Sequence, residues 1–267
     1  MADSERTGEG AAIVRPGGVR IMETWVDRVA MDDAVDHIET LVSEGDFSYT
    51  VTPNVDHLIK LRHDPEFRAA YAAADLSVPD GVPLLWASRL LGTPLPERVN
   101  GTDLFVRLCA MAARKDYSVY LVGGAPGTAA AATRVLREQH DGLRIAGNAC
   151  PPIGFDRRSA TNDPVVEAVA ASGADILFVA LGAPKQEKWI HAHGNRTGVR
   201  HAIGIGGSFA LIAGDIRRAP LWAQRSGLEW AWRLAHEPKR LWRRYLVDDL
   251  PFLRYLAKLF VRSHLRR

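Results

Sequence analysis

The stretch ADLSVPDGVPL, residues 74–84, decides the fold prediction. A short apolar strand pattern, Leu76–Val78, is followed by a proline and then by Asp80, which stands just before a glycine. Pro83 then opens a helical run, Leu84–Leu91. Ligands of open α/β sheets gather at the carboxyl ends of the strands, so an acid at this point is well placed for chemistry. The alternative is that Asp80 caps the helix or closes an Asx turn by accepting backbone N–H hydrogen bonds.

The rest of the chain repeats this alternation of short apolar strands and amphipathic helices. We expect strands at Val19–Val26, Phe47–Thr52, Leu76–Val78, Ser118–Val122, Leu143–Gly147, Ile176–Leu181 and His201–Ile205. We expect helices at Asp32–Val42, Val55–Leu61, Asp64–Ala73, Leu84–Leu91, Thr102–Ala113, Thr128–His140, Pro164–Ser172 and Glu187–His193. This alternation predicts an α/β fold whose mainly parallel sheet is covered by helices on both faces.

Composition limits the class of protein. The 267 residues, with 47% hydrophobic and 24% charged side chains, are ordinary for a soluble globular protein of one large or two small domains. Cys109 and Cys150 cannot form a disulfide framework, and no Cys/His cluster has zinc-site spacing, so a reducing cytosol is the simplest compartment. Residues 1–18 lack the apolar segment of a signal peptide and are expected to form a disordered tail. No apolar run reaches the length that a membrane span needs.

The basic residues are concentrated at the C-terminus. From Trp230 to Arg267 there are ten Lys/Arg against three Asp/Glu, a net charge of +7, whereas the rest of the chain has 24 against 28, or −4. Arg233, Arg240 and Arg243 are spaced to share one helical face if Pro238 permits. Tryptophans interleave with them, at Trp230, Trp232 and Trp242, and Leu250–Leu265 adds a further apolar face with basic residues.

Basic and aromatic amphipathic helices of this kind suit an anionic membrane surface. A nucleic-acid patch and a solvated charged helix are the alternatives. We favour the membrane and expect no nucleic acid partner. The same apolar helix faces leave a homo-oligomer open.

Polar or glycine-rich residues recur where predicted strands end. They are Thr52-Pro53-Asn54, Asp80-Gly81, Gly123-Gly124, the run Gly182 through Glu187, and Gly206-Gly207. The carboxyl ends of parallel strands lie along one edge of a sheet, so these residues are expected to converge on one crevice.

The Gly123–Gly127 turn resembles a phosphate cradle, in which backbone N–H groups at a helix start attract an anion. It matches neither a P-loop nor the dinucleotide fingerprint, so a nucleotide diphosphate is a better match than NAD. The alternative is a tight strand-to-helix turn with close packing.

No Asp-x-Asp pair is present, the device with which many nucleotide-sugar enzymes hold a divalent metal. Charge on a departing sugar diphosphate would then be met by arginines and backbone N–H groups. Arg98, in the loop after the helix that follows Asp80, is a candidate, and an ordinary surface arginine is the alternative.

Taken together, these motifs resemble the WecG/TagA/CpsF glycosyltransferases. The resemblance spans about Val19 to Tyr245. It rests on TPN (52–54), PDG (79–81), RVNGTD (98–103), GAPKQE (182–187), GIGGSF (204–209), RAP (218–220), GLEW (227–230) and EPKR (237–240).

The resemblance implies an inverting, metal-independent enzyme of Rossmann-like fold with no cofactor. Such an enzyme transfers N-acetylmannosamine, its uronic acid or a related sugar from a UDP donor to an acceptor linked to undecaprenyl diphosphate, in cell-surface polysaccharide synthesis. It implies a catalytic domain at 19–228 and a membrane-associating helical appendage at 229–267. We accordingly expect a cytoplasmic protein associated peripherally with the inner face of the cell membrane. The alternative function is a nucleotide-binding regulatory module without catalysis.

The resemblance also implies roles for individual residues. Asp80 would be the general base that takes the proton of the acceptor hydroxyl. The expected substrate-binding residues are Thr52, Asn54, Arg98, Asn100, Gly123, Gly124, Gln186, Gly206 and Gly207. Arg233, Arg240 and Arg243 would contact the membrane or the acceptor. Ala210 departs from the family pattern, since an aspartate commonly follows the GGSF run.

Overall fold

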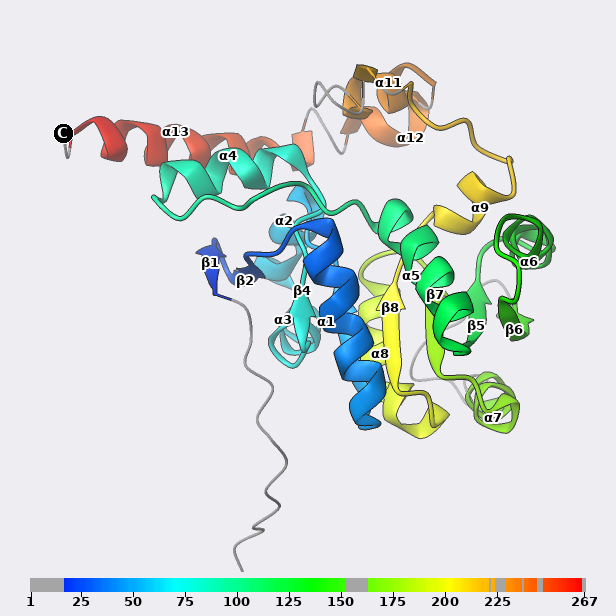
Figure 1. Cartoon of the computed structure of the whole chain (residues 1–267). Coiled ribbons are helices and arrows are strands. Elements are labelled where there is room, and N and C mark those ends of the chain that lie inside the picture. Colours follow the sequence, from blue (N-terminus) through cyan, green and yellow to red (C-terminus); the bar gives the residue numbers. More distant parts are fainter. Residues whose placement is uncertain are drawn as a thin grey trace, which may run out of the picture.

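The protein is an α/β structure built on one parallel sheet, as seen in a computed structural model that describes residues 17–151, 163–220, 222–223, 229–236, 238–243 and 247–265 (Figure 1). The sheet has six strands in the order β4-β3-β8-β7-β5-β6, and every pairing is parallel. The strands are β3 (Ser48–Val51), β4 (Leu76–Ser77), β5 (Ser118–Gly123), β6 (Arg144–Ala149), β7 (Ile176–Ala180) and β8 (His201–Gly204). The predicted Rossmann-like α/β fold is confirmed.

Helices cover both faces of the sheet. They are α1 (Met31–Glu44), α2 (Val55–His63), α3 (Pro65–Ala72), α4 (Val82–Leu90), α5 (Gly101–Lys115), α6 (Thr128–Gln139), α7 (Asp163–Ser172), α8 (Lys185–His193) and the short α9 (Ser208–Ile212). Side chains of β5 alternate between two hydrophobic clusters: Val119 and Leu121 pack with α1, α5 and α6, while Tyr120 and Val122 pack with α2, α3 and α8. A strand buried on both faces is what an apolar run such as 119–122 predicts.

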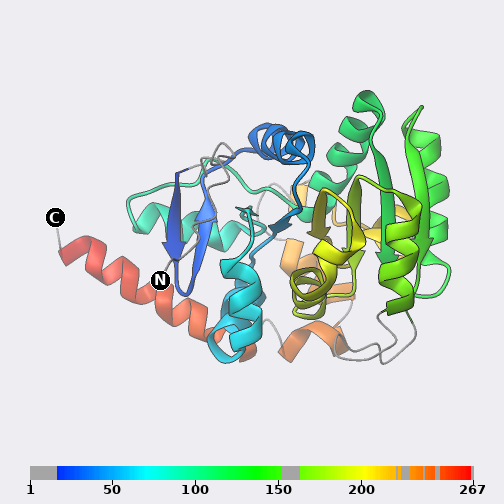
Figure 2. The same cartoon turned by 90° about the horizontal axis from the view of Figure 1, so that it is seen from below.

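The N-terminal region corrects one prediction. Val19–Val26 was expected to be a single strand, but it forms an antiparallel hairpin of β1 (Gly18–Ile21) and β2 (Thr24–Asp27), separate from the main sheet (Figure 2). The chain reverses because Met22 adopts a left-handed backbone with φ of 52°, which suits a tight hairpin turn. The buried Asp27 carboxylate accepts a hydrogen bond from the Ser77 amide at 2.8 Å, which ties the hairpin to β4.

The C-terminal part folds into α11 (Glu229–His236), α12 (Pro238–Arg243) and α13 (Leu250–Leu265). Helix α13 lies alongside α4 (Figure 1) and buries Phe252 and Leu259 in the core cluster that includes the hairpin. Within the described residues, no helix combines the length and apolarity that crossing a bilayer requires. The division at residue 229 stays a prediction.

Candidate active site

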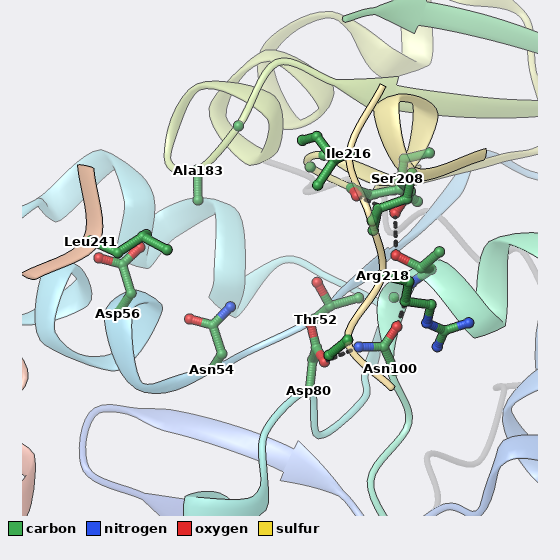
Figure 3. Close-up of a pocket in the computed structure, with 18 of the residues that line it drawn as sticks. Thr52, Asn54, Asp56, Asp80, Asn100, Ala183, Ser208, Ile216, Arg218 and Leu241 are labelled. Atoms are coloured by element: carbon green, nitrogen blue, oxygen red, sulfur yellow. Dashed lines mark hydrogen bonds between the residues drawn. The ribbon is translucent and has the colours of Figure 1, made fainter. Parts of the chain in front are cut away.

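A cavity of about 830 Å³ lies at the carboxyl ends of four of the strands (Figure 3). Its walls come from the segments that follow β3, β4, β7 and β8, from the start of α5, from the segment after α9, and from α11 and α12. The strand ends predicted to converge therefore do so, except the one after β5. A cavity of this size suits a ligand as large as a nucleotide sugar.

Most of the predicted substrate-binding residues line the cavity. Those that do are Thr52, Asn54, Asn100, Gln186, Gly206 and Gly207, and the predicted base Asp80 lines it as well. Three predicted residues, Arg98, Gly123 and Gly124, are not part of its lining.

Asp80 is held at the cavity wall by backbone and side-chain hydrogen bonds. Its N–H donates to the Pro53 carbonyl at 2.9 Å, so the turn after β4 is fixed to the turn after β3. The Asn100 side-chain amide donates to Asp80 Oδ1 at 3.2 Å (Figure 3). Helix α4 begins at Val82 with Gly81 as its N-cap and has no side-chain hydrogen bond at that cap. Asp80 is therefore not the N-cap residue of α4, and its partly exposed carboxylate faces the cavity.

Asn100 has two roles. Its side-chain oxygen accepts from the amides of Thr102 at 2.9 Å and Asp103 at 3.3 Å, so it is the N-cap of α5. Because the oxygen is used by the helix, the amide nitrogen is oriented toward Asp80. One buried side chain thus joins the start of a long helix to the acid.

Thr102 and Ser208 join α5 to α9 on the same wall. The Ser208 hydroxyl donates to the Ile205 carbonyl at 2.6 Å, so its 2.8 Å contact with Thr102 Oγ1 is donated by the threonine. Thr52 lies near Asp80 in Figure 3, and Gly101 packs close to both: a Cβ at Gly101 would stand 3.8 Å from Thr52 Cγ2 and 3.9 Å from Asp80 Oδ2. Hydrogen bonds and packing contacts thus surround the acid on this wall.

Gln186 lines the cavity but uses its side chain within the protein. Its Oε1 accepts from the amides of Gly182 at 3.1 Å and Gly206 at 3.0 Å, which joins the turns after β7 and β8. Its Nε2 donates to Glu187 Oε1 at 2.8 Å. A Cβ at Gly204 would stand 2.6 Å from this nitrogen, so glycine is required for the close approach.

Glu187 is a further carboxyl near the cavity; it ends the run 182–187 that was expected to converge there, but it had no assigned role. It is only 1% exposed, and its Oε2 has no hydrogen-bond partner. Burial raises the pKa of Glu187 from 4.5 to about 7, because the charged form loses its hydration there. Close by, Tyr71 hydrogen bonds to His57 Nδ1 at 2.6 Å, and burial with the nearby carboxyl of Glu187 raises the pKa of that tyrosine.

Gly123 and Gly124 form a tight turn outside the cavity. Gly123 has φ of 108°, and a Cβ there would stand 2.5 Å from the Ala180 carbonyl oxygen. The Gly124 amide donates to that same oxygen at 2.9 Å. These two glycines therefore allow β5 to approach β7 closely, which is the packing alternative to a phosphate cradle.

Arg98 points into an ion pair with the C-terminal part of the chain. Its Nη1 lies 2.9 Å from Glu229 Oε2, and the two side chains are 17% and 12% exposed. This pair joins the loop after α4 to the start of α11, and neither of its residues is part of the cavity lining.

The appendage contributes directly to the cavity. Trp232, His236 and Leu241 line it, and the rings of Trp232 and His236 stack with centroids 4.2 Å apart. Of the three predicted appendage arginines, the side chains of Arg233 and Arg240 lie outside the described part of the chain. Arg243 is exposed and its Nε is 3.9 Å from Asp248.

The charged residues that α2 and the segment after α9 contribute to the cavity were not predicted from the sequence. Asp56 and Lys60 of α2 line the cavity, as do Arg217 and Arg218 after α9. The RAP motif was the signal for Arg218, since it was part of the family resemblance without an assigned role. Within the described ranges, no group of three or more His, Cys, Asp or Glu could hold a metal ion. Metal independence stays a prediction.

Comparison with known proteins accounts for this architecture. The profile of the glycosyl transferase WecG/TagA/CpsF family matches residues 19–266. This chain belongs to the WecG/TagA/CpsF family. It is therefore a glycosyltransferase.

Two similar proteins carry the same name, N-acetylglucosaminyldiphosphoundecaprenol N-acetyl-beta-D-mannosaminyltransferase. The protein from Bacillus spizizenii is 34% identical over 213 residues, which cover 79% of this chain and 80% of the relative. The one from Bacillus subtilis strain 168 is 31% identical over 183 residues, 68% of this chain and 69% of the relative.

Proposed function

We propose that this glycosyltransferase moves a sugar from a UDP-sugar to a saccharide carried on undecaprenyl diphosphate, in cell-surface polysaccharide synthesis. The names of the two relatives support the acceptor class, since they describe transfer of N-acetyl-β-mannosamine to N-acetylglucosaminyl diphosphoundecaprenol. N-acetylmannosamine or a related hexose or uronic acid is the donor sugar we propose.

The position of Asp80 is the observation that carries the proposal. Its carboxylate is held by Asn100 at the edge of a cavity large enough for the donor. As the acceptor hydroxyl attacks the anomeric carbon, Asp80 takes the hydroxyl proton, the new glycosidic bond forms, and the bond to UDP breaks with both electrons leaving on the phosphate oxygen. A positioned base of this kind is worth roughly 10²–10⁴ in rate.

Direct displacement inverts the configuration at the anomeric carbon. A β linkage, as in the names of the relatives, is the product of such a displacement on an α-linked donor. The proposed reaction uses no metal ion, and cationic side chains neutralise the negative charge on UDP.

We also propose that the appendage associates with the anionic inner face of the cell membrane. Apolar Leu253, Phe260 and Val261 of α13 are each more than half exposed. The basic side chains Arg254 and Lys258 on the same helix are exposed as well. Substituting Leu253 and Phe260 together by Asp is expected to abolish sedimentation with vesicles of anionic lipid. Unchanged sedimentation would contradict the membrane proposal.

The function is tested by screening a panel of UDP-sugars for UDP release with and without a polyprenyl-diphosphate-linked acceptor. The proposal predicts release that depends on the acceptor for at least one UDP-sugar. Nucleotide binding with no transfer to any acceptor would instead favour the alternative, a binding module without catalysis.

A further inference from the structure

We propose that Arg217 and Arg218, in the segment after α9, form a diphosphate-binding site of the cavity. This inference rests on the proposed function, because that function places two diphosphates near Asp80: that of the UDP donor and that of the lipid-linked acceptor. Both arginines line the cavity, and the Arg218 side chain lies beside Asn100 and Asp80 in Figure 3.

The backbone groups first expected to hold a diphosphate are already occupied. The amides of Gly182 and Gly206 donate to Gln186 Oε1, and that of Gly124 donates to the Ala180 carbonyl. A backbone N–H has one hydrogen to donate, so these three amides are not free to donate to a phosphate oxygen.

Side-chain cations are the other groups that can neutralise the charge, and few of them line the cavity. Arg98 is paired with Glu229 away from the cavity. Lys60 lines the cavity, but its Nζ is 2.6 Å from Asp56 Oδ2 and also donates to the Ala183 carbonyl at 3.2 Å. Among the lysines and arginines whose side chains are described, the remaining ones in the cavity lining are Arg217 and Arg218.

Arg217 and Arg218 differ in their contacts with the rest of the protein. The Arg218 guanidinium is oriented by Asp103, whose Oδ2 lies 2.6 Å from Nη2, and the two side chains are 38% and 39% exposed. Arg218 thus keeps other N–H groups for a ligand. Arg217 is exposed and has no hydrogen bond or ion pair to another described residue. A guanidinium presents its donors in a planar fork that matches phosphate oxygens, so adjacent arginines suit a diphosphate.

The test is the double variant Arg217→Gln/Arg218→Gln in the full-length protein. The matched control is Arg107→Gln, since Arg107 is also an exposed arginine with one ion pair, 2.8 Å to Asp32, and lies outside the cavity lining. Calorimetry with UDP, UMP and uridine measures their Kd values and so tests whether the site binds the diphosphate of the donor. Initial rates against acceptor concentration give the KM for the acceptor and so test whether the site binds the diphosphate of the acceptor.

The loss of charged hydrogen bonds is expected to weaken binding about tenfold to hundredfold. If the site holds the donor diphosphate, the Kd for UDP rises by that factor while the Kd for uridine stays the same. If it holds the acceptor diphosphate, the KM for the acceptor rises instead. The proposal is overturned if both values stay within twofold of the Arg107→Gln control. A wild type without acceptor-dependent UDP release would show that the proposed function itself has failed.

Discussion

Asp80 and Glu187, two of the carboxyl groups near the cavity, differ in their surroundings. Asp80, after β4, is partly exposed, lines the cavity and accepts a hydrogen bond from Asn100. Glu187, in α8, is 1% exposed, lies behind Gln186 and is not part of the lining. The pKa of Glu187 is raised to about 7 by burial, which would suit a general base at neutral pH.

The comparison shows why geometry must be considered before pKa. A base must come within hydrogen-bonding distance of the proton that it removes, and of these two carboxyl groups Asp80 is the one that lines the cavity where a substrate fits. Glu187 instead accepts from the amide of Gln186, which in turn joins the turns after β7 and β8. Of the two, Asp80 is therefore the group that we propose as the base, whereas Glu187 is hydrogen bonded within the wall.

The largest expected effect is that of Asp80→Asn. The substitution keeps the shape of the side chain but removes the proton acceptor, so kcat for transfer is expected to fall about 10²- to 10⁴-fold. The Kd for UDP, measured by calorimetry, is expected to stay within threefold. Turnover close to that of the wild type would contradict the role of Asp80. Glu187→Gln, assayed in parallel, is expected to keep turnover within a few fold at neutral pH.

Next in size is the effect of Glu187 on stability. The folded pKa of about 7 exceeds the ordinary 4.5, so the folded protein keeps its proton in a pH range where the unfolded chain has lost it. The free energy of unfolding should therefore fall as the pH rises from about 4.5 to 7. Relative to Glu187→Gln, the wild type should lose on the order of 2–3 kcal/mol across this window.

Urea denaturation at pH 5 and pH 8 measures this difference. Glu138→Gln, a substitution of an exposed glutamate in α6, is the control and should leave the pH dependence as it is. If Glu187→Gln has the same pH dependence as the wild type, the account of Glu187 is wrong.

A smaller effect is expected at Asn100, where the two roles can be separated. Asn100→Ala removes the N-cap of α5 and should cost about 1 kcal/mol of stability. Asn100→Asp can still cap the helix but cannot donate to Asp80, and it places a second negative charge beside it. Its melting temperature is expected to stay near that of the wild type while kcat falls about tenfold. Equal activity of Asn100→Asp and wild type would show that the contact with Asp80 has no role in catalysis.

The alternation of strands and helices was predictable because it depends on local hydrophobic patterns. Asp80 could be placed in the cavity because the carboxyl ends of parallel strands share one edge. Gly123 and Gly124 do not line the cavity because of the strand order: β5 neighbours β6 toward the far edge of the sheet, and its turn packs against the end of β7. Local hydrophobic patterns do not determine the order of the strands in the sheet.

Long-range partners account for the other differences. Arg98 pairs with Glu229, which is 131 positions away in the chain, and nothing near Arg98 indicates this partner. Glu187 stands in the polar run KQEK, which looks exposed, yet α8 buries it. Leu241 reaches the cavity only because α12 packs over it. These features depend on tertiary packing.

The most direct test of the central claim is the anomeric configuration of the first-formed product. Loss of activity in Asp80→Asn would be expected whether Asp80 acts as a base or as a nucleophile, but the two roles give different stereochemistry. If Asp80 is the base of a single displacement, NMR of the product from an α-linked UDP-sugar should show a β linkage. An α linkage would indicate a covalent glycosyl intermediate and would contradict the account.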